Sequence, residues 1–129
     1  MFSKDALAKI CSLEQHFAFS TAVAFALVTA GPGITNMATA IGGAWLESRE
    51  LLIVGGQART EFISSSEVRQ IGHQQIDGRS IVEPMSKLSI TITEPISRNE
   101  LKSLTDSSKT GRKGTVFLEI CLDVTAMEV

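Results

Sequence analysis

The sequence predicts an α/β fold of three layers, in which helices cover both faces of a mostly parallel sheet that is incomplete at the N-terminus. Three observations lead to this prediction. Short, continuous apolar runs recur along the chain, as in strands that are buried on both faces. Between these runs lie segments with apolar residues at three- and four-residue steps, as in helices. The connections are short and hold glycine and proline, which is typical of strand–helix–strand units.

The first strand–helix–strand unit is predicted from the N-terminal half of the sequence. Residues 23–28 (VAFALV) form the first apolar run, and residues 51–54 (LLIV) form the second, which Gly55 and Gly56 close. Between the two runs, apolar side chains at helical spacing predict a helix over residues 34–48. We therefore expect two buried strands joined by one amphipathic helix.

The middle of the chain is predicted to contain less regular structure. The polar stretch 59–66 carries three consecutive serines and is expected to be a loop. A helical turn is predicted over residues 67–72, and a short helix ended by Pro84 over residues 76–85. Residues 88–92 (LSITI) alternate apolar and polar side chains, which indicates a strand with one wetter face near an edge of the sheet.

The C-terminal part is predicted to add one more helix and one more strand. Ser97 stands three residues before Glu100, which is the capping-box pattern that opens a helix, and this helix is expected to end near Lys109. Residues 115–122 (TVFLEICL) read as the last strand, with apolar side chains on both faces except at Glu119.

Composition bounds the class of protein. A chain of 129 residues suits one domain, and 43% hydrophobic with 20% charged residues is typical of a globular fold. The net charge of -2 argues against a nucleic-acid partner, which would need a basic face. No apolar run approaches the ~20 residues that a membrane helix requires, so no membrane partner is expected. Cys11 and Cys121 lie far apart in apolar contexts and are expected to be small buried side chains in a reducing, cytoplasmic compartment.

The turn Gly31-Pro32-Gly33 lies where the first strand meets the first helix. In an open parallel sheet, ligands bind outside the carboxyl ends of the strands. Gly31 and Gly33 can adopt backbone conformations that other residues avoid, while Pro32 stiffens the turn. Taken alone, the motif favours a tight turn without a ligand. A flavodoxin-like or nucleotide-binding domain is a weaker alternative, because no phosphate-loop signature is present.

Five segments in a fixed order resemble a known family. They cover about residues 12–125, and they are VTAGPGITNMATAIGGAWLES, LLIVGGQ, RQIGHQQID, PMSK and FLEICLDV. Together they resemble the pyrimidine-binding domain at the N-terminus of thiamine diphosphate-dependent enzymes of the acetolactate synthase type. The fold of that domain is a parallel sheet with helices on both faces, which agrees with the prediction made from the residues alone.

The resemblance implies a catalytic glutamate and a set of cofactor-binding residues. The family's glutamate hydrogen-bonds a ring nitrogen of the cofactor's aminopyrimidine, and its counterpart here is Glu14 in SLEQH. An exposed residue at a helix start, favoured by the helix dipole, is the alternative for Glu14. Lys87 also matches a family position near the cleft or a subunit interface, with a helix-end position as its alternative. The implied cofactor-binding residues are Gly31, Pro32, Gly33, Asn36, Gln57 and Gln74.

The resemblance also implies partners. In the family, the diphosphate and its Mg²⁺ are bound by a separate domain that carries Gly-Asp-Gly and Asn-Asn, and neither motif occurs in this sequence. Residues 1–129 are therefore expected to be a single truncated pyrimidine-binding domain that binds thiamine diphosphate with Mg²⁺ supplied through a domain it lacks. A partner chain or a homo-oligomer would complete the site, and the reaction would cleave or form a carbon–carbon bond of a 2-keto acid. The alternative is a non-catalytic relative that serves as an interaction module.

Overall fold

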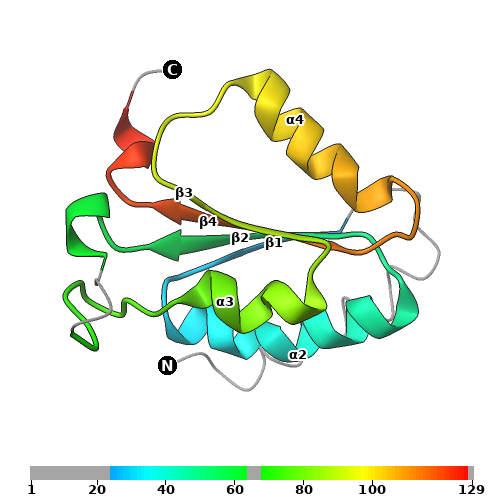
Figure 1. Ribbon diagram of the computed structural model, residues 1–129, viewed down its shortest axis with the longest axis horizontal. Coiled ribbons are helices and arrows are strands. Elements are labelled where there is room, and N and C mark those ends of the chain that lie inside the picture. Colours follow the sequence, from blue (N-terminus) through cyan, green and yellow to red (C-terminus); the bar gives the residue numbers. More distant parts are fainter. Residues whose placement is uncertain (1–23, 64–67, 128–129) are drawn as a thin grey trace.

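The computed structural model describes residues 24–63 and 68–127 (Figure 1). The predictions made for Glu14 and Cys11 lie outside the described residues. None of the described helices has the length and apolar character that crossing a membrane requires. The strands are β1 (Ala24–Val28), β2 (Leu51–Gln57), β3 (Leu88–Ile92) and β4 (Thr115–Cys121), and the helices are α2 (Pro32–Glu47), α3 (Gly78–Val82) and α4 (Arg98–Asp106).

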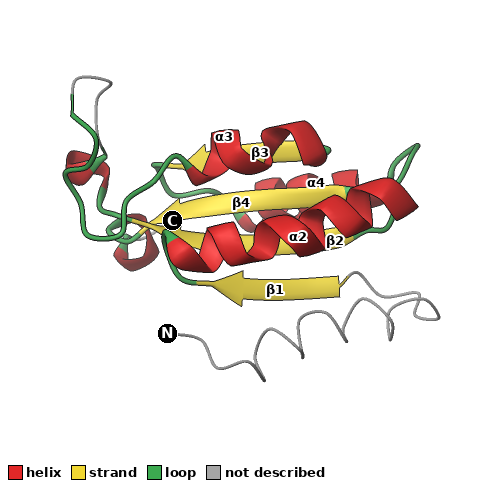
Figure 2. Ribbon diagram, turned by 90° about the horizontal axis from the view of Figure 1, so that it is seen from below, coloured by secondary structure: helices red, strands yellow, loops and turns green. Residues whose placement is uncertain are grey.

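The strands form one parallel sheet with the order β1-β2-β4-β3. Helices α2 and α3 cover one face of the sheet, and α4 lies over the other face (Figure 1). The three-layer α/β prediction is therefore confirmed. Strand β3 lies at an edge of the four described strands, as its alternating pattern predicted. Because all four strands run the same way, their carboxyl ends meet at one rim of the sheet (Figure 2).

A hydrophobic core lies on each face of the sheet. On the α2 and α3 face, Ile34 and Ile41 pack with Ile53 of β2 and Phe117 of β4, and all four side chains are fully buried. Burial of each such side chain stabilises the fold by roughly 1.5–3 kcal/mol. The core on the α4 face is built from Ile92, Val116, Leu118, Cys121 and Val124. The expectation that Cys121 is a buried thiol is confirmed, and burial raises the pKa of this thiol, which keeps it protonated.

Helix α2 begins two residues before its predicted start. Pro32 stands at the first helical position, where the fixed φ of proline suits the helix and its missing N–H leaves no bond unmade. The helix ends at Glu47, since Ser48 turns into the left-handed region with φ 55° and donates its N–H to the helix. Arg112 stacks over the Trp45 ring at 5.4 Å from the ring centre, which fixes this end against the β4 side of the fold.

Helix α4 begins with the predicted capping box. The Ser97 hydroxyl oxygen accepts a hydrogen bond from the Glu100 backbone N–H at 3.2 Å. The Glu100 carboxylate accepts in return from the Ser97 N–H at 2.7 Å. A 3-10 turn (Ser107–Lys109) follows the helix, so the helical stretch ends at Lys109 as predicted.

Further predictions differ from the structure. Strand β1 was expected to be buried, yet Phe25 and Leu27 are 56% and 71% exposed. Strand β2 continues through Gly55 and Gly56 to Gln57, because glycine supplies the backbone groups of the ladder as well as any residue. A Cβ at Gly55 would lie 3.1 Å from both Ile34 and Phe117, so helix packing requires the glycine here. The helical turn predicted over residues 67–72 is wrong for its described part, where residues 68–72 form bends and no helical turn. Pro84 lies inside a 3-10 turn (Glu83–Met85) that follows α3.

Candidate functional site

Two glycine-containing turns lie next to each other at the carboxyl rim of the sheet. The Gly31 turn follows β1, and Gly56 lies near the end of the neighbouring strand β2. A Cβ placed on Gly56 would be 3.4 Å from the backbone nitrogen of Ala30, so the two backbones are almost in contact. The Gly31 turn and the glycines at the end of β2 therefore share one rim of the sheet.

Gly31 adopts a conformation that glycine alone tolerates well. Its φ is +61°, and its carbonyl oxygen accepts hydrogen bonds from the N–H groups of Ile34 at 3.0 Å and Thr35 at 3.1 Å, which start α2. A Cβ at this position would lie 2.5 Å from the carbonyl oxygen of Gln74. The turn is therefore closed from outside by a segment some forty residues further along the chain. Gly33 is buried beside it, while Pro32 and Asn36 are exposed.

Gln57 lies at the rim, but its amide group is buried, with 6% of the residue exposed. Its Nε2 donates to the carbonyl oxygen of Ile76 at 2.8 Å, and its Oε1 accepts from the Ala58 N–H at 2.8 Å. The resemblance implies a cofactor-binding role for Gln57. In the structure, this side chain joins the end of β2 to the segment that leads into α3.

Gln74 is exposed and holds a positive φ of 56°, so its carbonyl can turn towards Gly31. Its neighbour Gln75 was not predicted as a site residue, yet it is only 8% exposed. The Gln75 Oε1 accepts from the N–H of Ile71 at 3.1 Å, which folds residues 71–75 into a compact turn. No periodicity in the sequence marks Gln75 as buried.

Glu119 is the buried acid of the site. The sequence marked it only as the exception in an apolar strand, and the structure leaves just 2% of it exposed. Its Oε2 accepts from the Thr91 hydroxyl at 2.9 Å, whereas its Oε1 has no hydrogen-bond partner among residues 24–63 and 68–127. Burial raises the pKa of this carboxyl above its ordinary value, and the negative charge of Asp77 acts in the same direction.

Two further aspartates fix loops at the same rim. The Asp77 side chain caps α3 by accepting from the Ser80 N–H at 3.0 Å, and this hydrogen bond lowers the pKa of Asp77. Asp123 accepts from both the N–H (3.0 Å) and the hydroxyl (2.5 Å) of Thr60, and the hydroxyl contact lowers the pKa of Asp123 most. The two bonds between Asp123 and Thr60 join the loop that follows β4 to the loop that follows β2.

An open hollow of about 500 Å³ lies at this rim. Side chains of Leu27, Val54, Ile120 and Leu122 give it an apolar wall, and Gly55, Gly56 and Gln57 belong to its lining. Leu27 and Leu122 are 71% and 60% exposed. Within the described part of the chain, no three His, Cys, Asp or Glu side chains gather into a possible metal site. The described part of the rim thus offers apolar side chains and glycine backbone to a contacting group.

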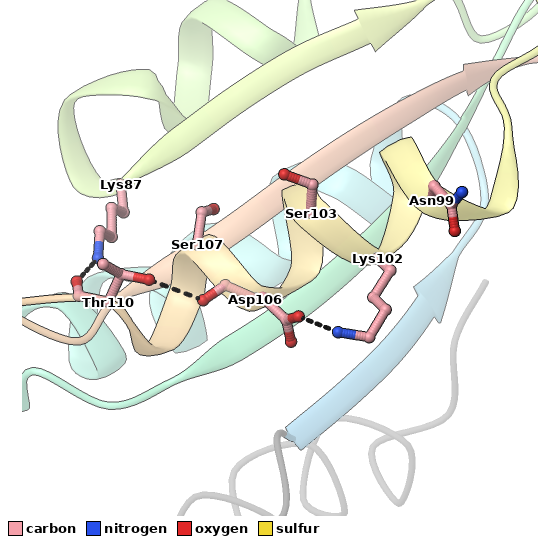
Figure 3. A pocket seen from close by; sticks show the side chains of 7 residues that line it. All are labelled: Lys87, Asn99, Lys102, Ser103, Asp106, Ser107 and Thr110. Carbon is pink, nitrogen blue, oxygen red and sulfur yellow. Dashed lines mark hydrogen bonds and ion pairs between the residues drawn. The ribbon is translucent and has the colours of Figure 1, made fainter.

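A second hollow of about 650 Å³ lies between α4 and the amino end of β3, away from the glycine turns (Figure 3). Lys102 reaches Asp106 at 2.6 Å, and the Lys87 ammonium donates to the carbonyl oxygen of Thr110. Because parallel strands place their amino ends opposite the ligand-binding rim, Lys87 lies away from the site. Lys87 lies in a bend between the 3-10 turn (Glu83–Met85) and β3, close to the helix-end position given as its alternative.

Comparison with known proteins identifies relatives of the whole segment. The chain is 29% identical over 127 residues to 2-hydroxyacyl-CoA lyase 2 of Homo sapiens, covering 96% of this chain and 18% of that protein. It is 32% identical over 125 residues to the Danio rerio protein of the same name, covering 95% and 18%. It is 31% identical over 119 residues to the acetolactate synthase large subunit of Lactococcus lactis subsp. lactis, covering 90% and 20%.

The chain thus spans about a fifth of the length of these relatives. A family model described as the thiamine pyrophosphate enzyme, N-terminal TPP binding domain, matches residues 14–81, which is more than half of the chain and includes the Gly31 turn, β2 and the start of α3. The chain therefore belongs to the family of thiamine pyrophosphate enzymes, as a member of its N-terminal TPP binding domain.

Proposed function

We propose that this chain supplies the pyrimidine-side half of a thiamine diphosphate site in an acetolactate synthase-like enzyme. The observation that carries the proposal is the contact between the Gly31 turn and Gly56 at the carboxyl rim. Small residues there let the ends of β1 and β2 approach each other closely, and the neighbouring hollow has an apolar wall. The rim therefore suits the organic ring of the cofactor.

Each predicted site residue takes a part in this proposal. Glu14 is the carboxylate that hydrogen-bonds a nitrogen of the aminopyrimidine and holds the required tautomer. Pro32, Asn36 and Gln74 are exposed around the Gly31 turn and would form the surface against the ring or a partner. Gly31, Gly33 and Gln57 are buried and would act by shaping that surface.

The diphosphate end of the cofactor would be held elsewhere. The described residues offer no cluster of oxygen ligands for a divalent cation, so the proposal assigns Mg²⁺ and the diphosphate to a further domain, on a partner chain or a second copy. When bound, thiamine diphosphate supplies a carbon nucleophile that makes and breaks carbon–carbon bonds next to a carbonyl. We propose 2-keto acids as substrates, with 2-hydroxyacyl-CoA, the substrate class in the name of some relatives, as a comparison.

The test is a calorimetric titration of thiamine diphosphate with Mg²⁺ into the chain, with and without a companion chain that carries Gly-Asp-Gly and Asn-Asn. Tight binding is expected only in the mixture, together with turnover of a 2-keto acid. Glu14→Gln should reduce that turnover by roughly 10²- to 10⁴-fold, the usual range for a lost proton-transfer group. Glu47→Gln, an exposed change at the end of α2, is the matched control and should leave turnover unchanged. Absence of binding in both arrangements would overturn the proposal.

A non-catalytic interaction module is the second candidate, and the buried amide of Gln57 favours it. Both ends of that amide are already hydrogen-bonded within the chain, as in a structural turn. This candidate expects Glu14→Gln to change no partner-dependent activity. It also expects the companion chain to bind equally well with and without thiamine diphosphate.

A further inference from the structure

Residues 72–78, here called the closing segment, cover the Gly31 turn from outside. The Gln74 carbonyl oxygen packs against Gly31, in space that any side chain would fill. Two residues later, the Ile76 carbonyl oxygen accepts a hydrogen bond of 2.8 Å from Gln57 at the end of β2. The closing segment is thus fixed at two points by groups that carry no titratable charge.

A third point of attachment is Glu119, which lies under the end of the closing segment. A Cβ on Gly78 would be 2.5 Å from the Glu119 Oε1, so the carboxyl lies directly against the backbone of Gly78. The other carboxyl oxygen is held by Thr91 at 2.9 Å, from the neighbouring strand β3. The carboxyl therefore lies between the sheet and the residue at which the closing segment becomes α3.

The surroundings of this carboxyl favour its neutral form. Within the described ranges, no ion pair involves Glu119. Its neighbour of like charge is Asp77 at the start of α3, whereas the Cys121 thiol on its own strand is protonated. The Thr91 hydroxyl, the Gln57 amide and the Gly78 N–H favour ionisation, but neither of the last two completes a hydrogen bond to Oε1. An ionised Oε1 would need a donor that the closed arrangement does not give it, and a buried charge without one is costly.

We propose that Glu119 is a positioning residue, whose neutral carboxyl holds the closing segment on the Gly31 turn through its contact with Gly78. When the proton leaves to solvent, the Glu119 Oε1 must find a hydrogen-bond donor. The closing segment then shifts so that the Gly78 N–H can donate to Oε1, and this shift moves the segment off the Gly31 turn. The rim is then open in a fraction of the molecules that grows with pH. This inference rests on the proposed function for what the rim binds. The coupling between the protonation of Glu119 and the position of the closing segment is a property of the free chain.

The test is NMR spectroscopy of the full chain, labelled so that the Glu119 side-chain carbon and the backbone amides are both observed. The Glu119 carbon is expected to titrate above the ordinary range of a glutamate, and the amides of Gly31, Gly72 and Gly78 should shift with the same midpoint. Glu119→Gln keeps the shape and a neutral side chain, so it should show the low-pH positions of these amides at every pH. Gly78→Ala, which fills the space above Oε1, should displace the same amides without any change of pH.

Thr115→Val is the matched control, because Thr115 lies on the same face of β4, is buried, and also has an oxygen without a hydrogen-bond partner among the described residues. It should leave the pH response of the rim intact. The inference is overturned if Glu119 titrates in the ordinary range, or if Glu119→Gln keeps the pH-dependent shifts of the rim. A confirmed coupling in a chain that binds no thiamine diphosphate even with the companion chain present would overturn the proposed function alone.

Discussion

At the scale of single residues, the site depends on which glycines cannot be replaced. Gly31 and Gly111 share a φ of +61°, yet only Gly31 has a neighbour in the space that a side chain would occupy. The Gln74 carbonyl is backbone, so it cannot move aside as a flexible side chain would. Gly31 is thus constrained both by its own conformation and by the closing segment.

Gly31→Ala is expected to destabilise the chain by more than the roughly 1–2 kcal/mol that a left-handed backbone costs alanine, because Gly31 combines φ 61° with ψ -107°, which lies outside the left-handed helical region. The contact with Gln74 adds to this loss. Gly111→Ala is the comparison variant, since Gly111 shares the φ of +61° but has nothing within 4 Å of the added Cβ. Urea unfolding of both variants measures the difference. Equal losses would show that the closing segment does not press on the turn.

The raised pKa of Glu119 predicts a component of stability that falls as pH rises. A carboxyl with a raised pKa binds its proton more tightly in the folded chain, so its contribution is full below the unfolded pKa. It declines between the unfolded and the folded pKa, and it stays constant above both. Asp77 and Asp123, whose pKa values are lowered, act oppositely and lose their contribution as pH falls.

Glu119→Gln should therefore remove the decline of stability above the ordinary pKa of a glutamate and leave the loss at low pH as it is. Unfolding by urea across a series of pH values measures both parts of the profile. A profile that keeps its decline in the variant would assign the decline to another group.

At the scale of elements, the capping box of α4 illustrates what local sequence determines. Ser97→Ala removes the acceptor for the Glu100 N–H and should destabilise the chain by about 1 kcal/mol. Ser103→Ala, an exposed change in the middle of the same helix, should have no such cost, because alanine is a better helix former. Thermal unfolding of the two variants compares them, and equal melting temperatures would show that the cap contributes nothing.

Elements with a local signal were predicted well, and those fixed by distant contacts were not. The edge strand at residues 88–92 and the capped helix after Ser97 follow from alternation and capping, which neighbouring residues alone determine. The bends at residues 68–72 depend on the Gln75 side chain, which reaches back to Ile71. The roles of Gln57 and Glu119 arise from strands and loops that only the fold brings together, so no local pattern announces them.

At the scale of the whole molecule, the rim is assembled from segments far apart in the sequence. Gln57 joins β2 to the closing segment, so its loss should loosen one region rather than the whole fold. Gln57→Leu leaves the Ile76 carbonyl without its donor, at a cost of about 1–3 kcal/mol. Hydrogen exchange should become faster in residues 72–78 and remain unchanged in β4. Glu94→Gln, an exposed change in the loop after β3, is the control, and uniform exchange in both variants would contradict the assignment.

The most direct test of the account is to titrate the aminopyrimidine fragment of thiamine into the isotopically labelled chain and follow its amide signals. The fragment lacks the diphosphate, so it reports on the proposed ring side of the site alone. Shifts concentrated at Gly31, Gly33, Gly55 and Gly56, and weakened by Gly31→Ala, are the result that the account predicts. Shifts centred on the hollow between Lys87 and Thr110, or no shifts at millimolar fragment, would contradict it.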